Sequence, residues 1–190
     1  MNPRFSAGTQ AAVLTVSDRC SAGIQTDLSG PAVVRLLQEA GISAIRHAIL
    51  PDEVGEIAHA LRHHAAEVHL IVTTGGTGLA PRDVTPEATL MVCDRTVDGL
   101  SERMRAEGLK HTPTAILSRA VCGCIGSTLV INLPGSVAGA ETSLAAVLPV
   151  LPHAIDILNN RTEHKSPGGK TTPGAPSQSA PSVEVVGDAE

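Results

Sequence analysis

Apolar residues along the chain fall into two alternating patterns. Buried strands are indicated by short, nearly continuous apolar runs at 11–17, 43–50, 68–73 and 128–132. Between and after these runs, apolar residues recur three and four positions apart, which is the period of a helix with one buried face. This spacing predicts helices at 29–41, 51–61, 86–95, 100–107 and 137–158. The last helix should be kinked or restarted at Pro149 and Pro152.

The alternation of strands and helices predicts the fold class. Parallel strands need crossover connections, which helices usually supply, and several of the runs are apolar at every position, as in strands covered on both faces. We therefore predict an α/β domain of three layers, α/β/α, with a mostly parallel sheet, over residues 8–161. Residues 162–190 are rich in Pro, Gly, Ser and Thr and predict a disordered tail.

Composition narrows the kinds of partner. The chain has 190 residues, a net charge of −5, no Trp or Tyr and a single Phe. An acidic chain without aromatic side chains for base stacking is a poor nucleic-acid binder. No apolar stretch reaches about 18 residues, and the first residues lack the apolar region of a secretory signal. We therefore expect no membrane span and a cytoplasmic location. The four scattered cysteines predict reduced thiols rather than disulfides or a zinc site.

Polar residues follow the ends of four predicted strands. Ser17-Asp18 follows the first, Asp52 the second, Thr74-Gly75-Gly76-Thr77-Gly78 the third, and Asn132 to Ser136 the last. In a parallel sheet these segments lie at one edge, where ligands of open α/β folds bind. The glycines allow close backbone approach to a ligand, and successive N–H groups there can hold a phosphate. A tight strand-to-helix turn is the structural alternative for the same glycines.

Two aspartates indicate that a cation binds together with the phosphate. Asp83 follows the glycine turn, and a carboxylate beside a phosphate requires a cation between them; Mg²⁺ takes one or two carboxylates together with phosphate oxygens. Asp52 offers the second carboxylate, although helix capping is the alternative for either residue. Arg82 either neutralises phosphate charge or pairs with Asp83. The pattern predicts a Mg-nucleotide site.

The histidines suggest a second kind of metal site, which we set aside. His59 and His63 are four positions apart on a predicted helix, and His64 is adjacent. No Glu is placed as in a His-Glu-x-x-His zinc protease. We interpret these histidines as a solvated helix face. Ser17 has no His and Asp partners in the sequence that would make it a nucleophile.

Several longer stretches resemble a known family. Residues 73–78 and 81–88 (TTGGTG and PRDVTPEA) resemble the signature of molybdenum-cofactor biosynthesis proteins, specifically the molybdopterin adenylyltransferases and the N-terminal domain of gephyrin. The stretches 17–19, 51–53, 112–119 and 132–135 are similar to that family in the same order. The resemblance covers about residues 10 to 160.

The resemblance implies transfer of AMP from Mg-ATP to the terminal phosphate of molybdopterin, with release of pyrophosphate, by a protein that is commonly a trimer. The alternative is a non-catalytic molybdopterin carrier or scaffold of the same fold. The resemblance also implies a downstream partner that inserts molybdate. The two essential aspartates of the family correspond to Asp52 and Asp83, which we expect to hold Mg²⁺. Together with the strand-end residues, the substrate-binding set is Ser17, Asp18, Thr74, Gly75, Gly76, Thr77, Gly78, Arg82, Ser118, Asn132, Pro134, Gly135 and Ser136.

Overall fold

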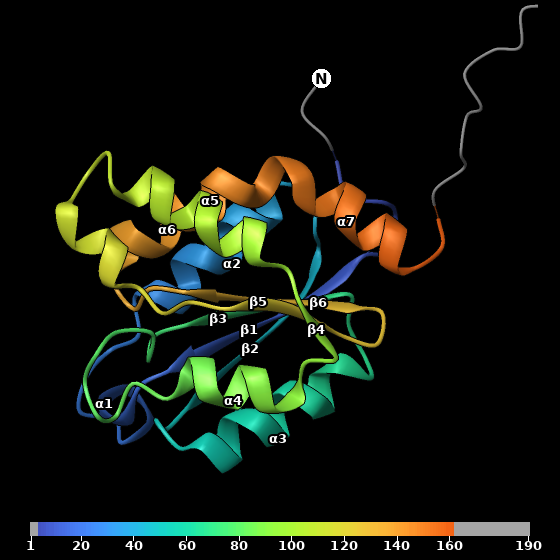
Figure 1. Ribbon diagram of the computed structural model, residues 1–190. Helices are drawn as coiled ribbons and strands as arrows, with labels where there is room; N and C mark the ends of the chain where they lie inside the picture. The colour runs from blue at the N-terminus through green and yellow to red at the C-terminus, as the bar shows by residue number, and fades with distance from the viewer. Residues whose placement is uncertain (1–3, 162–190) are drawn as a thin grey trace, which may run out of the picture.

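The computed structural model describes residues 4–161 and shows a six-stranded mixed sheet (Figure 1). In spatial order the strands are β2 (Ala44–Leu50), β1 (Gln10–Val16), β3 (Leu70–Thr74), β6 (Thr128–Leu133), β5 (Cys122–Ile125) and β4 (Arg95–Thr96). The first four are mutually parallel, β5 is antiparallel to β6, and β4 is antiparallel to β5. The mostly parallel sheet is confirmed. The predicted tail lies outside the described residues.

Helices cover both faces of the sheet (Figure 1). One face carries α2 (Ser29–Glu39), α5 (Asp98–Gly108), α6 (Val137–Val147) and α7 (Leu151–Leu158). The opposite face carries α1 (Asp18–Ser21), α3 (Val54–Ala65) and α4 (Thr85–Val92). This arrangement confirms the three layers.

The central strand β1 shows why the core has two halves. All its residues after Gln10 are buried. Ala11 and Val13 belong to the apolar cluster beneath α2 and α6, whereas Ala12 and Leu14 belong to the cluster beneath α3 and α4. Successive side chains of a strand point to opposite faces, so a strand covered on both sides must be apolar throughout.

The carboxyl-terminal helical segment breaks where the prolines predict. A 3₁₀ turn, η2 (Leu148–Val150), separates α6 from α7. Contrary to the expectation from apolar runs, 137–158 as a whole is long and apolar enough to cross a membrane by length and composition. Leu144, Val147, Leu151 and Ile155 of this segment are at most 1% exposed and belong to the core. Packing within the domain therefore explains part of its apolar character, while Val150 and Ile157 are exposed.

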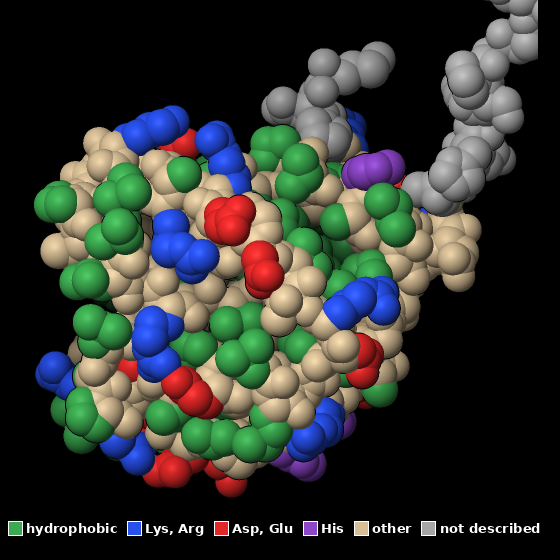
Figure 2. All heavy atoms as spheres, in the orientation of Figure 1, with side chains coloured by type: hydrophobic (Ala, Val, Ile, Leu, Met, Phe, Trp, Pro, Cys, Tyr) green, Lys and Arg blue, Asp and Glu red, His purple; other side chains and the backbone are tan. Residues whose placement is uncertain are grey.

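Four short elements have no counterpart in the sequence prediction. They are α1, β4, β5 and a second 3₁₀ turn, η1 (Pro113–Leu117). The cysteines are unpaired, as expected, and burial raises the pKa of the Cys122 thiol to about 12. On the face in Figure 2, acidic and basic side chains are interspersed with apolar ones.

Strand order fixes where a ligand can bind. The chain leaves β1 for β2 on one side, and β3 is followed on the other side by β6. The carboxyl ends of β1 and β3 therefore flank a point at which connections leave in opposite directions, and such points form crevices in open α/β sheets.

Candidate active site at the carboxyl edge of the sheet

Two adjoining cavities open at this edge. The larger, of about 800 Å³, lies among α5, η1 and α6, and the smaller, of about 400 Å³, lies beside β1 and the loop before α2. Four residues line both: Gly76, Asp83, Gly135 and Ser136. The two cavities therefore meet where the glycine turn, the loop before α4 and the turn after β6 come together.

The glycine turn after β3 requires glycine at two positions. Gly75 and Gly76 have φ of 105° and 61°, in the left-handed region that glycine adopts without steric cost. A Cβ on Gly75 would overlap the carbonyl oxygen of Val16, and one on Gly76 would overlap Oγ1 of Thr85. The Thr85 hydroxyl donates to the Gly75 carbonyl at 2.9 Å and the Thr85 N–H to the Gly76 carbonyl at 3.1 Å. The start of α4 thus holds the turn in place.

This turn offers hydrogen-bond donors to a ligand. Among the described residues, the backbone N–H groups of Gly76, Thr77 and Gly78 have no hydrogen-bond partner. Gly135, in the turn after β6, lies against Gly75, since a Cβ there would be 3.2 Å from the Gly75 Cα. Unpaired N–H groups in a bare, closely packed turn suit an anionic ligand such as phosphate.

Asp52 is held by a reciprocal contact with Asp18. The Asp18 N–H donates to Oδ2 of Asp52 at 2.8 Å, and the Asp52 N–H donates to Oδ1 of Asp18 at 3.0 Å. The Arg82 guanidinium donates two hydrogen bonds of 2.9 Å to Asp18 and one of 2.8 Å to Glu53. Arg82 thereby lowers the pKa of Asp18, the backbone of Asp52 adding to the effect.

Asp52 and Asp83 carry the uncompensated negative charge of the site. Burial raises the pKa of Asp52, and the neighbouring charges of Asp18 and Asp83 raise it further. Asp83 accepts the Ala80 N–H at 2.8 Å, with Oδ2 close to Gly78, while Oδ1 of Asp52 lies close to Gly76. The charge of Asp83 disfavours the ionised form of Asp52, and a hard divalent cation would relieve this repulsion, because oxygen is its preferred ligand.

Most of the predicted site residues line the cavities. Besides the four shared residues, the smaller cavity is lined by Ser17, Asp52, Thr74 and Gly75, and the larger by Thr77, Gly78, Ser118 and Pro134. Ser17 and Ser136 also cap helices, accepting the N–H of Cys20 and Gly139 respectively. Thr74 donates to the Pro134 carbonyl at 2.8 Å and so joins the two turns.

One predicted substrate contact is corrected, and two others do not line the cavities. Asn132 is fully buried: its amide donates to Thr73 and Thr89, both at 3.0 Å, and its oxygen accepts the Val121 N–H at 3.2 Å. Its hydrogen bonds are made inside the core, so it is not on either cavity wall. Asp18 and Arg82 do not line either cavity; their side chains are exposed and paired with each other, and their role as substrate contacts stays a prediction. Arg82 pairs with Asp18 and Glu53 rather than with Asp83.

Two residues of the site are not among the predicted site residues, although Arg119 lies in the family-like stretch 112–119. Arg119 donates to the carbonyls of Gly78 and Asp83 and to the Glu87 carboxylate, and so fixes both ends of the loop that carries Asp83. The preceding sequence, Leu117-Ser118, does not indicate this, because all three partners lie more than 30 positions away.

Asp27 is the second missed residue, and it anchors a wall of the smaller cavity. Its side chain is 5% exposed and accepts from Thr15 Oγ1 at 2.6 Å and the Gly30 N–H at 3.0 Å, with His47 Nε2 at 3.0 Å. Burial opposes ionisation, but the hydrogen bonds from Thr15 and Gly30 and the charge of His47 outweigh it and lower the pKa of Asp27. Gly30 has no room for a side chain, because a Cβ would overlap all three side chains.

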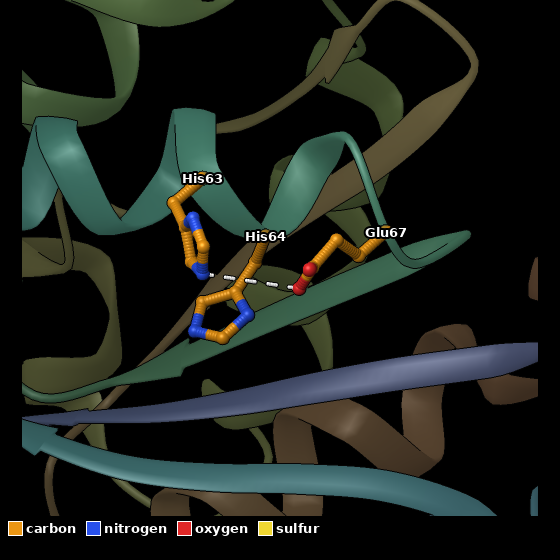
Figure 3. Close-up of side chains that lie close together, drawn as sticks. All are labelled: His63, His64 and Glu67. Carbon is orange, nitrogen blue, oxygen red and sulfur yellow. Dashed lines mark ion pairs between the residues drawn. The ribbon is translucent and has the colours of Figure 1, made fainter.

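The histidines of α3 lie away from these cavities. Asp52 immediately precedes Glu53, the N-cap of α3, whereas His63 and His64 are in its last turn, about 17 Å further along the helix at 1.5 Å per residue. Figure 3 shows their rings beside Glu67. His59 and His63 are exposed, as expected, but His64 is partly buried, which corrects the prediction of a fully solvated face.

Comparison with known proteins assigns the family. Residues 12–153 match the family described as "probable molybdopterin binding domain". The chain is 43% identical over 150 residues to the molybdopterin adenylyltransferase of Helicobacter pylori, covering 77% of this chain and 85% of that protein. It is 39% identical over 166 residues to gephyrin of Dictyostelium discoideum, covering 82% of this chain and 23% of gephyrin.

A solved structure supports the same assignment. The molybdopterin biosynthesis enzyme MoaB from Thermus thermophilus superposes with a TM-score of 0.75 at 47% identity, covering 80% of this chain and 97% of that one. The family match spans both glycine turns, Asp52 and Asp83. The chain therefore belongs to the molybdopterin-binding domain family of molybdenum-cofactor biosynthesis proteins.

Proposed function

We propose that the protein is a molybdopterin adenylyltransferase that uses ATP. The terminal phosphate oxygen of molybdopterin attacks the α-phosphorus of ATP; a new P–O bond forms, the bond from the α-phosphorus to the bridging oxygen breaks, and pyrophosphate leaves. The observation that carries the proposal is the meeting of two cavities at Asp83 and the glycine turns. Two substrates bound side by side would bring their phosphates together there.

Each group of site residues has a separate role in the proposed reaction. The unpaired N–H groups of Gly76, Thr77 and Gly78 bind phosphate oxygens. Asp52 and Asp83 hold Mg²⁺, which when bound neutralises phosphate charge and orients the phosphates. Arg82 neutralises the charges of Asp18 and Glu53. By holding Asp18, which accepts the Asp52 N–H, it also keeps Asp52 in place. The protein forms no covalent bond to either substrate in this reaction, so catalysis comes from positioning and electrostatics.

Other parts of the proposal rest on the family and on composition. We infer a homotrimer in the cytoplasm that passes its product to a molybdate-inserting protein and binds neither nucleic acid nor a membrane. The negative net charge and the near absence of aromatic residues support the last two points.

A turnover assay tests the function. Purified protein is incubated with molybdopterin, ATP and Mg²⁺, and the products are separated to detect adenylylated molybdopterin and pyrophosphate. We expect product that requires both Mg²⁺ and Asp83, with Asp83→Asn folded but inactive. Tight molybdopterin binding with no product in the wild type would instead indicate a carrier or scaffold.

A further inference from the structure

A cluster of two imidazoles and one carboxylate lies at the carboxyl end of α3. His63 and His64 are in the last turn of the helix, and Glu67 follows in a turn closed by a hydrogen bond from the Glu67 N–H to the His64 carbonyl, at 2.9 Å. One donor atom from each side chain lies within 4.8 Å of the other two. Figure 3 shows the three side chains converging, with the His63 ring and Glu67 joined as an ion pair.

His64 contains a buried nitrogen without a partner. Within the part of the chain that the structure describes, Nδ1 of His64 is the single buried side-chain nitrogen or oxygen that makes no hydrogen bond. Leaving such an atom unsatisfied costs about 1–3 kcal/mol, so it calls for an explanation such as a bound ion or water. In Figure 3 the nitrogen next to the attachment point of the His64 ring lies on the side facing Glu67.

An imidazole binds a metal ion through the lone pair of a neutral ring nitrogen, and solvent reaches this cluster. His63 and Glu67 are both more than a third exposed, so an ion has access from solvent.

Separations in the cluster are close to those of a coordinated ion. Bonds of about 2.0–2.1 Å in a tetrahedral site place ligand atoms about 3.4 Å apart. Nε2 of His63 and Oε2 of Glu67 are 3.8 Å apart, so small side-chain rotations would bring them into a coordination sphere. Three protein ligands leave a fourth position for water.

Arg46 is the competitor for this site. Its guanidinium reaches from β2 to the carboxylate of Glu67. An ion on Glu67 must displace that contact and accept a nearby positive charge. This competition makes a specific prediction, because removal of the Arg46 charge should strengthen metal binding.

We propose that His63, His64 and Glu67 form a binding site for a divalent transition-metal ion of the zinc class. The imidazoles select such ions over Mg²⁺, which prefers oxygen ligands alone, so this site differs from the one at Asp52 and Asp83. The ion would join the last turn of α3 to the turn that leads into β3. Because it binds the folded chain, it would also stabilise the fold by mass action.

The test uses the full chain, prepared without a polyhistidine tag, in excess Mg²⁺ to occupy the carboxylate site. Co²⁺ is titrated and followed by its visible absorption, and Zn²⁺ is titrated by calorimetry. We expect one site, weakened at least about tenfold in His64→Ala and in His63→Ala, since even residues behind the ligands typically contribute 10–100-fold. Arg46→Gln should tighten binding.

His59→Ala is the matched control. His59 stacks on His63 one turn earlier, with ring centroids 6.5 Å apart, but is outside the cluster. It should keep wild-type affinity. The proposal is overturned if the wild type shows no saturable Co²⁺ site, if His64→Ala binds as the wild type does, or if His59→Ala loses as much affinity as His64→Ala. Thermal unfolding without metal checks that every variant is folded, and none of these readouts depends on adenylyl transfer.

Discussion

Replacing Asp27 by Asn tests how the wall of the smaller cavity is anchored. The substitution keeps the shape of the side chain and removes its charge. In the wild type, Oδ2 faces the Thr15 hydroxyl at 2.6 Å and Nε2 of His47 at 3.0 Å, and Oδ1 faces the Gly30 N–H at 3.0 Å. Because the Thr15 proton is given to Asp27, Nε2 of His47 faces two acceptor oxygens and must carry a hydrogen.

The magnitude follows from this arrangement. An Asn can still accept the Gly30 N–H with its oxygen, but its NH₂ then faces the Thr15 hydroxyl and the Nε2–H of His47. The hydroxyl can turn to accept, whereas the Nε2–H loses the charged acceptor Asp27 and keeps only the Thr15 oxygen at 3.1 Å. The loss of one charge-assisted, buried hydrogen bond should lower the free energy of unfolding by about 2 kcal/mol. For a domain of this size that corresponds to a drop in Tm of about 4–8 °C.

Urea unfolding at a series of pH values is the assay. The folded-state pKa of Asp27 lies below its ordinary 3.8, so its stabilising contribution is present above about pH 3.8 and is lost as pH falls toward the folded value. The difference between wild type and Asp27→Asn should therefore be full at pH 7 and shrink in acid. Asp94→Asn, which also removes a carboxylate that accepts one N–H but at an exposed position, should change stability by less than about 0.5 kcal/mol. Equal stability of wild type and Asp27→Asn at pH 7, or a difference that persists unchanged in acid, would refute the reasoning.

Three further substitutions test the site. Arg119→Lys keeps the charge but cannot hold both loop carbonyls, so turnover should fall about 10- to 100-fold while urea unfolding changes little; a stability loss with normal turnover of the folded fraction would contradict this. Asn132→Ala leaves Thr73 and Thr89 without their buried partner and should cost about 3 kcal/mol in urea unfolding, with substrate affinities unchanged in calorimetry. Asp18→Asn removes a like charge beside Asp52, whose pKa is raised chiefly by burial and then by Asp18; the acid limb of the pH–rate profile should move to lower pH, and a move to higher pH would count against the assignment.

The sequence predicts β1 and β3 because each is a nearly continuous apolar run, the pattern of a strand buried on both faces. β1 and β3 are continuous apolar runs that end in the polar residues of the site, so both strand and site emerge from one signal. β5 reads Cys-Gly-Cys-Ile and β4 is two residues long, too short for any period to show. Their antiparallel pairing with β6 depends on contacts that the local sequence does not encode.

Asn132 shows where site prediction from the sequence fails. It stands next to the turn at Pro134 and Gly135, which does line the cavities, so proximity along the chain suggests a ligand contact. Its strand register instead sets it beside Thr73 of β3, and its side chain is drawn into the core by that threonine and by Thr89. In a strand buried on both faces, neither side is marked as polar, so the direction of one polar side chain cannot be read from alternation.

The order of strands and helices explains why carboxylates gather at this edge and supports the proposed cation there. Asp18, Asp52 and Asp83 each stand between the carboxyl end of a parallel strand and the start of a helix, α1, α3 and α4 respectively. Helix N-termini favour negative charge, so each position alone is favourable for an aspartate. Parallel strands bring the three positions together, and the carboxylates then repel one another; burial raises the pKa of Asp52, and the charges of Asp18 and Asp83 raise it further. Arg82 neutralises Asp18 and Glu53 but does not reach Asp83. The charge left on Asp52 and Asp83 would repel the phosphates that we propose the glycine turn binds, and the proposed divalent cation between them would resolve this conflict.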